Sequence, residues 1–185
     1  MRIISGNKKG KKILLPNPKI TRPLKDNVKE NIFNILLHTK HFKTELEGSN
    51  IIDFFSGSGS FGLECLSRGS KKVAFLEKNA ETRNTLFRNL SNNFEKNKFQ
   101  ILKDNFFLYD KLNLIIKYNP KIIFIDPPYK IENFEHICNF INTLIKFKEI
   151  LIILHIEKTR HVYFDNFKHK LEKTYGTSKI VFLKN

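Results

Sequence analysis

The segment Asp126-Pro127-Pro128-Tyr129 combines residue types that could make an exocyclic amino group nucleophilic. It directly follows the apolar run 121–125, which places it at the end of a predicted strand. The Asp126 carboxylate and the Pro127 carbonyl can each accept one N–H of an amine, which frees its lone pair for an electrophile. The two prolines stiffen the turn, and Tyr129 offers a ring for an unstacked base. The pattern predicts amino methylation, although Pro-Pro turns also end ordinary strands.

A glycine-rich turn after the apolar segment 51–55 is the second candidate site. Its glycines fit the G-x-G-x-x-G spacing of dinucleotide-binding folds, so a nicotinamide-dependent oxidoreductase is one interpretation. However, Asp53 precedes the first glycine by four residues, where its charge would repel a pyrophosphate. A cationic ligand such as S-adenosylmethionine, which carries a sulfonium and an ammonium group, suits this acid better. The predicted cofactor residues of this turn are Asp53, Ser56, Gly57 and Gly59.

Two further acids follow the next apolar segments and complete a predicted nucleoside site. Glu77 lies 20 residues beyond the first glycine of the turn, which fits a clamp on ribose hydroxyls. Asp104 follows the third segment, where it could accept a hydrogen bond from an adenine amino group. Either acid could instead be the N-cap of a helix. Because ligands of open α/β sheets bind at the carboxyl ends of the strands, we expect both acids to converge with Asp53 and Asp126.

Alternating apolar patterns predict the elements that must position these residues. Strands are expected near 50–55, 72–77, 99–103, 121–126 and 149–155, and helices near 28–36, 60–68, 79–95, 106–117 and 132–147. This alternation predicts an α/β fold with a parallel sheet covered by helices on both faces. A turn signal at 176–178 predicts an antiparallel hairpin at the C-terminal edge. Residues 2–15 are expected to form a small hairpin.

Length and composition predict a single domain. A chain of 185 residues, of which 41% are hydrophobic, is long enough to bury one sizeable core. Within the domain 1–185 we expect a basic N-terminal extension, 1–48, and a cofactor-binding catalytic core, 49–185.

Basic residues outnumber acidic ones by 33 to 18, which gives a formal net charge of +15. This excess suits a polyanionic partner such as nucleic acid. Lysine far outnumbers arginine, however, so part of the charge could reflect an AT-rich genome. One lysine cluster flanks Gly10 and predicts an arm that touches phosphates, unless it is simply a solvated run. Its members are Lys8, Lys9, Lys11 and Lys12.

The sequence shows no pattern typical of a metal site, a disulfide or a membrane anchor. Cys65 and Cys138 fall in helical patterns without metal-ligand spacing, and no leader-like apolar segment opens the chain. The longest apolar stretch, 150–156, is too short to span a bilayer. His155 interrupts this stretch and is interpreted as a satisfied core residue rather than a ligand. We therefore expect a reduced, cytoplasmic protein without a metal or a membrane partner.

Nearly the whole chain resembles the bacterial RsmD family, the 16S rRNA guanine-N2 methyltransferases. The resemblance is most specific at 2–12 and 21–36, and it extends over 53–68 and the closing Tyr175-Gly176. It implies a Rossmann-like class I methyltransferase fold with strand order 3-2-1-4-5-7-6 and S-adenosylmethionine as the cofactor. It also implies direct, in-line transfer of methyl to N2 of guanine 966. The implied partner is 16S rRNA, the small ribosomal subunit or its assembly intermediate, bound by a monomer.

The chain departs from the family pattern in one helix. The family usually has Thr-Arg-Pro-Thr followed by Asp-Arg-Val-Arg-Glu, whereas Leu24, Asn27 and Lys29 replace a threonine and two arginines here. A lysine keeps the charge but cannot make the bidentate phosphate contact of an arginine. The further residues expected to contact RNA are Arg22, Lys25 and Lys29.

Two other functions remain open from the residues alone. A DNA adenine-N6 or cytosine-N4 methyltransferase would use the same Asp-Pro-Pro-Tyr turn, but so short a chain shows no separate target-recognition domain. A non-catalytic RNA-binding or assembly module would have no need of the Asp126 side chain. The residues and the resemblance together favour an rRNA methyltransferase.

Overall fold

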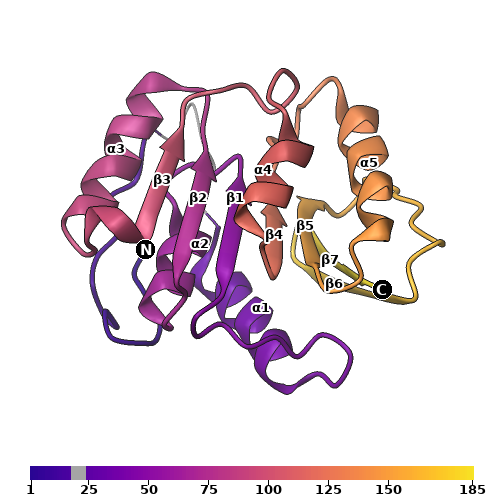
Figure 1. The fold of residues 1–185 in the computed structure, drawn as a ribbon, viewed down its shortest axis with the longest axis horizontal. Coiled ribbons are helices and arrows are strands. Elements are labelled where there is room, and N and C mark those ends of the chain that lie inside the picture. The colour runs from indigo at the N-terminus through magenta and orange to yellow at the C-terminus, as the bar shows by residue number, and fades with distance from the viewer. Residues whose placement is uncertain (18–23) are drawn as a thin grey trace.

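The computed structural model describes residues 1–17 and 24–185, which form a seven-stranded sheet with helices on both faces (Figure 1). The strands are β1 (Asn50–Phe54), β2 (Lys72–Leu76), β3 (Phe99–Leu102), β4 (Ile122–Ile125), β5 (Leu151–Glu157), β6 (His169–Tyr175) and β7 (Ser178–Lys184). Their order is β3-β2-β1-β4-β5-β7-β6. The first five strands are parallel to one another, while β7 runs antiparallel to both β5 and β6. The expected strand order and the C-terminal antiparallel edge are both confirmed.

Alternate residues of the strands point into two separate apolar layers. The helices are α1 (Asp26–His38), α2 (Ser60–Ser67), α3 (Ala80–Ser91), α4 (Lys111–Tyr118) and α5 (Phe134–Thr143), with short 3₁₀ turns at Lys96–Lys98 and Leu144–Lys146. One apolar layer joins the sheet to the N-terminal arm (residues 1–13), α1, α2 and α3, and the other joins it to α4, α5 and the segment 162–167. Because both faces of the central strands are covered, these strands are almost continuously apolar.

One helix starts later than expected, and the predicted N-terminal hairpin is short. The helix predicted over 106–117 begins only at Lys111, because Asp110 caps it by accepting a hydrogen bond from the backbone N–H of Asn113 at 3.0 Å. The hairpin predicted over 2–15 is present but short: Arg2 and Lys12 form an isolated antiparallel bridge, flanked by backbone hydrogen bonds from Ile3 N–H to the Lys11 carbonyl at 2.9 Å and from Ile13 N–H to the Met1 carbonyl at 3.1 Å. Further backbone groups of this arm are bound by α2.

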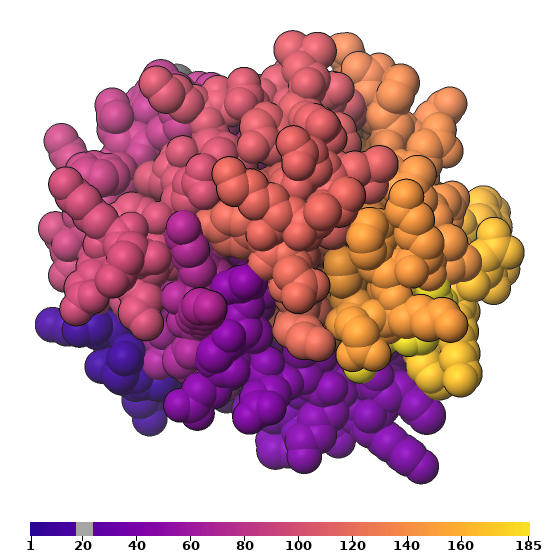
Figure 2. Space-filling view, in the orientation of Figure 1, coloured from indigo at the N-terminus to yellow at the C-terminus, as the bar shows by residue number. Residues whose placement is uncertain are grey.

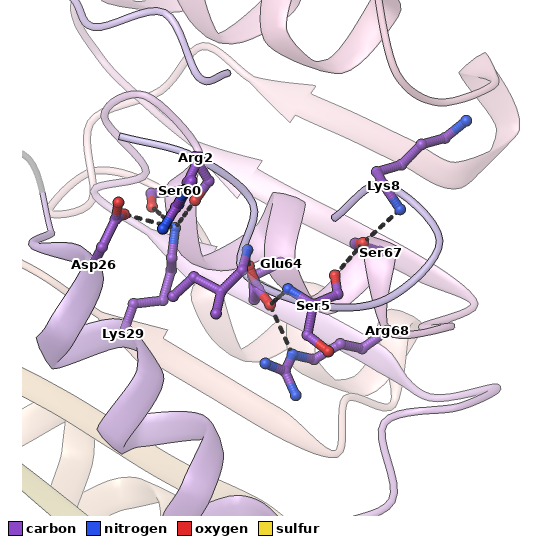
Figure 3. Close-up of polar contacts among 10 residues, drawn as sticks. Arg2, Ser5, Lys8, Asp26, Lys29, Ser60, Glu64, Ser67 and Arg68 are labelled. Atoms are coloured by element: carbon purple, nitrogen blue, oxygen red, sulfur yellow. Dashed lines mark hydrogen bonds and ion pairs between the residues drawn. The ribbon is translucent and has the colours of Figure 1, made fainter. Parts of the chain in front are cut away.

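The N-terminal arm is held on α2 by a buried carboxylate and a hydroxyl (Figure 3). The fully buried Glu64 accepts hydrogen bonds from the backbone N–H groups of Ile4 and Ser5, at 2.7 and 2.9 Å, and from Arg68 Nε at 2.8 Å. Ser67 Oγ donates to the carbonyl of Ser5 at 2.6 Å and accepts from the N–H of Lys8 at 3.0 Å. The arm is therefore part of the folded core and not a free tail.

Within residues 1–17 and 24–185, no helix has both the length and the apolarity needed to cross a membrane.

Candidate active site

A cavity of about 430 Å³ opens where the parallel strands end and brings most of the predicted site residues together. Its walls come from the loops after β1, β2, β3 and β4, as expected for the carboxyl edge of an open α/β sheet. The predicted residues that line it are Asp53, Ser56, Gly57, Glu77, Asp104, Asp126, Pro127, Pro128 and Tyr129. The Asp-Pro-Pro-Tyr corner is thus accessible from the same space as the predicted cofactor site.

Asp53, in β1, contributes a buried acid with an unused acceptor. Its side chain is almost fully buried, and Oδ2 accepts a hydrogen bond from the backbone N–H of Gly62 at 3.2 Å. Oδ1 has no hydrogen-bond partner among the described residues. Burial raises the pKa of the Asp53 carboxyl well above its ordinary value, and the nearby Asp126 and Glu77 charges add to this. A cationic ligand group would donate the missing hydrogen bond to Oδ1 and would offset the cost of burying the charged carboxylate.

The glycine turn after β1 is shaped by left-handed backbone and close packing. Phe55 adopts φ 60°, a conformation that costs a bulky residue about 1 kcal/mol or more and that turns the chain sharply out of the sheet. Ser56 Oγ donates to the carbonyl of Asp53 at 2.6 Å, which closes the turn. Gly59 was expected to bind the cofactor but does not line the cavity. Its φ is +79°, and an added Cβ would lie 2.4 Å from Leu86 Cδ1, so a side chain at this position would be strained and would press on α3.

Glu77 joins the glycine turn to the start of α3. Its Oε2 accepts from the N–H of Gly57 at 3.0 Å, and its Oε1 accepts from the N–H of Asn79 at 2.9 Å. Each carboxylate oxygen keeps a second acceptor position that ribose hydroxyls could use. Glu77 is not the N-cap of α3, because Asn79 fills that role by accepting from the N–H of Thr82 at 2.9 Å. The carboxylate is preorganised at the cavity wall.

Asp104 lies on the loop after β3 and is exposed at the cavity. It does not cap the next helix, since the N-cap of α4 is Asp110. The capping interpretation is therefore wrong for both acids.

Residues of β5, of the segment after it and of the turn between β6 and β7 hold the Asp-Pro-Pro-Tyr corner in place. Asp126 Oδ1 lies 2.8 Å from Nδ1 of the buried His155, at the carboxyl-end part of β5. Tyr129 OH lies 2.8 Å from Ser178 Oγ, and Arg160 donates to the Tyr129 carbonyl at 2.7 Å. Sequence reasoning missed Arg160 and Ser178, and it gave His155 only as a satisfied core residue, which its burial and hydrogen bond confirm. Only His155 carried a signal, as a polar residue near the end of an apolar strand.

Comparison with known proteins places the chain in a family. A family model described as "Conserved hypothetical protein 95" matches residues 1–184. Over 90 residues the chain is 43% identical to "Ribosomal RNA small subunit methyltransferase D", or RsmD, of Haemophilus influenzae, an alignment that covers 49% of this chain and 44% of that protein. The chain belongs to the RsmD family.

Further relatives agree with the RsmD assignment. "Putative rRNA methyltransferase YlbH" of Bacillus subtilis is 31% identical over 144 residues, which is 77% of this chain and 74% of that protein. The crystal structure titled "putative methylase HI0767" from Haemophilus influenzae matches with a TM-score of 0.70 at 27% identity and covers 100% of this chain and 98% of that one. The Rossmann-like methyltransferase fold expected of an RsmD protein is confirmed.

The residues expected to contact RNA lie in different places. The arm lysines Lys8, Lys9, Lys11 and Lys12 surround a turn that docks at the end of α2 away from the glycine turn, and all but Lys8, which is half-buried, are exposed. In Figure 3 the side chain of Lys8 points away from the network that anchors its backbone. Lys25 is exposed directly before α1. Arg22 lies outside the described residues.

Lys29 departs from the expected role in RNA binding. Its side chain is fully buried, and Nζ donates to the carbonyl of Arg2 at 2.7 Å and to Ser60 Oγ at 3.1 Å (Figure 3). An ion pair with Asp26 at 3.5 Å completes its contacts. Burial lowers the pKa of the Lys29 ammonium, although Glu64 and Asp26 oppose the shift. The residue ties α1 and the arm to the first residue of α2, so its ammonium does not reach a phosphate at the surface.

Proposed function

We propose that the protein methylates the exocyclic N2 amino group of a guanine in 16S rRNA, with S-adenosylmethionine as the methyl donor. One observation carries this proposal: the Asp126-Pro127 acceptor corner opens into the same cavity as the acids and glycine turn of the nucleoside site. Membership of the RsmD family supports the rRNA substrate, and we place the target at guanine 966. The proposed partner is the small ribosomal subunit or an assembly intermediate in the cytoplasm, bound by a monomer.

The residues present fit S-adenosylmethionine. The cavity of about 430 Å³ has the size of a typical small-molecule site. The unpartnered Oδ1 of Asp53 suits a cationic group, Glu77 suits the ribose, and Asp104 suits the adenine amino group. When bound, the cofactor supplies a sulfonium-activated methyl group whose S–C electron pair stays with the sulfur.

The corner after β4 would prepare the substrate amine. Asp126 and the Pro127 carbonyl accept its two N–H groups, so the nitrogen lone pair is withdrawn from conjugation and becomes nucleophilic. Tyr129, whose hydroxyl is held by Ser178, offers its ring to a base taken out of its stack. Asp126, already hydrogen-bonded to the amine, would also accept the proton that the amine loses after methylation. Neither described cysteine lines the cavity, so no covalent enzyme intermediate is needed.

The function is tested by supplying the purified protein with tritiated S-adenosylmethionine and three substrates in parallel. These are small ribosomal subunits, free 16S rRNA and duplex DNA, each taken from a strain that lacks its own RsmD-type enzyme. We expect N2-methylguanosine in rRNA by nucleoside mass spectrometry, and mapping of the modified nucleotide to guanine 966. Methylated adenine or cytosine in DNA would instead show a DNA amino-methyltransferase. Cofactor-independent RNA binding without methyl transfer would show an assembly module.

A further inference from the structure

Asp126 and His155 meet because of the register between two parallel strands. Ile125 of β4 pairs with Leu154 of β5, so the next residues along the two strands are Asp126 and His155. Both side chains emerge on the same face of the sheet, and Asp126 Oδ1 lies 2.8 Å from His155 Nδ1. The two residues are 29 positions apart in the sequence. The contact is therefore a property of the sheet and not of a local turn.

The fold restrains His155 far more than it restrains Asp126. The imidazole side chain is 3% exposed, whereas the Asp126 side chain is 18% exposed at the cavity. On its other side His155 pairs with Ile180 of β7, so its backbone lies between two strands. The Tyr129 ring stands edge-on, with its centroid 6.2 Å from that of His155. The buried imidazole is thus a fixed point against which a more exposed carboxylate can be oriented.

The hydrogen bond has a defined direction. An ionised carboxylate only accepts hydrogen bonds, so Nδ1 must carry the hydrogen that His155 donates to Asp126. This contact occupies one acceptor position on Oδ1 and leaves those on Oδ2 for another donor. Without it, a carboxylate at the end of a strand could rotate about its terminal torsion, which has broad, nearly two-fold energy wells.

We propose that His155 is a positioning residue for methyl transfer: it holds the Asp126 carboxylate in the orientation in which Oδ2 accepts an N–H of the substrate amine. This inference rests on the proposed function. It adds to the acceptor, Asp126, the residue that orients it, His155. Misplacing a reacting group by about 1 Å can cost on the order of a hundredfold in rate. A lost orientation should therefore slow the chemical step and leave ligand binding intact.

Two substitutions separate positioning from simple packing. His155→Phe fills the space without a donor, while His155→Asn places an amide nitrogen the same number of bonds from the backbone as Nδ1. We expect His155→Phe to lower the single-turnover rate on small ribosomal subunits by about tenfold or more, with His155→Asn within about threefold of the wild type. Calorimetric affinity for S-adenosylmethionine should be unchanged in both. Ile153→Val, on the same face of β5, is the matched control and should react at the wild-type rate.

A spectroscopic measurement tests the contact without any turnover. Long-range proton–nitrogen correlation spectra of the ¹⁵N-labelled protein should show hydrogen on Nδ1 of His155. In Asp126→Ala this signature should weaken, because the acceptor is gone. A bare Nδ1 in the wild type would overturn the inference even if His155→Phe failed to fold.

Different results with these variants test the inference and the proposed function separately. If Asp126→Ala still methylates rRNA at the wild-type rate, the proposed role of Asp126 falls, and the inference with it. If Asp126→Ala is inactive but His155→Phe reacts like the wild type, only the inference falls. A folded His155→Asn that is as slow as His155→Phe would also overturn it, because restoring the donor should restore the rate.

Discussion

Asp126 and Glu77 both lie at the ends of parallel strands, but their hydrogen-bond partners give them different tasks. Glu77 is bound through both oxygens to backbone N–H groups and so forms a fixed part of the cavity wall. Asp126 is held through one oxygen by His155 and is more exposed to the cavity. The first arrangement suits a ligand that binds unchanged, and the second suits a group whose contacts strengthen as charge develops.

Replacing Glu77 by alanine should therefore affect cofactor binding first. The variant loses charged acceptors for the ribose hydroxyls and also frees the N–H groups of Gly57 and Asn79. Hydrogen bonds to charged groups are worth about 1.5–3 kcal/mol each, so affinity for S-adenosylmethionine should fall about tenfold or more. Calorimetry measures this, with Asp126→Ala as the comparison, whose affinity should stay within about tenfold. An unchanged affinity in Glu77→Ala would refute the ribose clamp.

Asp53 should make the stability of the cofactor-free protein depend on pH. Its folded-state pKa is raised above the ordinary value of 3.8, chiefly by burial. Below that value the carboxyl is protonated in both states, so the shift has no effect. As the pH rises, the unfolded chain ionises first, and the folded protein loses stability until its own pKa is reached. The residue therefore destabilises the fold at neutral pH.

Asp53→Asn removes this titration and should raise the melting temperature of the cofactor-free protein. The gain over the wild type should be larger at pH 7 than at pH 4, since the wild-type carboxyl is increasingly protonated at the lower value. Thermal unfolding at several pH values measures the difference. An equal gain at both pH values would mean that ionisation of Asp53 does not contribute to the instability.

At the scale of elements, Glu64 connects two parts of the chain that are far apart in sequence. It lies on α2, which follows the glycine turn, and it holds the N-terminal arm by two backbone N–H groups. Lys29 makes a parallel connection from α1 to Ser60, the first residue of the same helix. The N-terminal arm and the glycine turn thus share α2 as a common support.

Glu64→Ala should destabilise the protein by about 3 kcal/mol, because it leaves buried donors of the arm and Arg68 without their acceptor. Urea denaturation measures the loss. Faster hydrogen exchange at the amides of Ile4 and Ser5 should localise it to the arm. The exposed Glu45 is the matched control, and Glu45→Ala should be nearly neutral. Unchanged exchange at Ile4 and Ser5 would show that Glu64 does not anchor the arm.

At the scale of the whole molecule, the N-terminal arm spans α2 from end to end: Lys29 links Arg2 to Ser60 at the start of the helix, and Ser67 at its end binds Lys8. The N-terminal arm fills one corner in Figure 2, across the molecule from the C-terminal strands. Its turn is attached to the far end of the eight-residue α2, about 12 Å from the glycine turn at 1.5 Å per residue. An RNA that presents a base to the cavity and also contacts the turn of the arm must span at least the length of α2.

Removing the arm charges should reduce the salt dependence of RNA binding. Each phosphate contact contributes about 0.7–0.9 to the slope of log K against log salt concentration, so changing all four arm lysines to glutamine should lower the slope by up to about 3. Filter binding at several salt concentrations measures this. A charge-matched control changes Lys117, Lys121, Lys146 and Lys148, which lie near the opposite, amino ends of β4 and β5. Equal slopes for the two variants would exclude a specific contact by the arm.

The acids at the strand ends could be predicted from the sequence because each depends on local signals and one general rule. Apolar runs mark the strands, and ligands bind at the carboxyl ends of parallel strands, so the convergence of Asp53, Glu77 and Asp126 required no knowledge of contacts. The C-terminal hairpin was equally accessible, since Tyr175 and Ser178 pair across a two-residue turn that Gly176 permits at φ 59°.

Burial and register, in contrast, were decided only by the tertiary structure. Lys29 looked like a surface cation, yet the arm and α2 supply oxygens that let its charge enter the core. Gly59 matched the glycine pattern of a cofactor turn, but only the structure shows that Leu86 leaves no room for a side chain there. His155 meets Asp126 only through the alignment of β4 with β5. Such contacts join residues distant in the chain, and no local pattern encodes which side chain a neighbouring strand or helix will present.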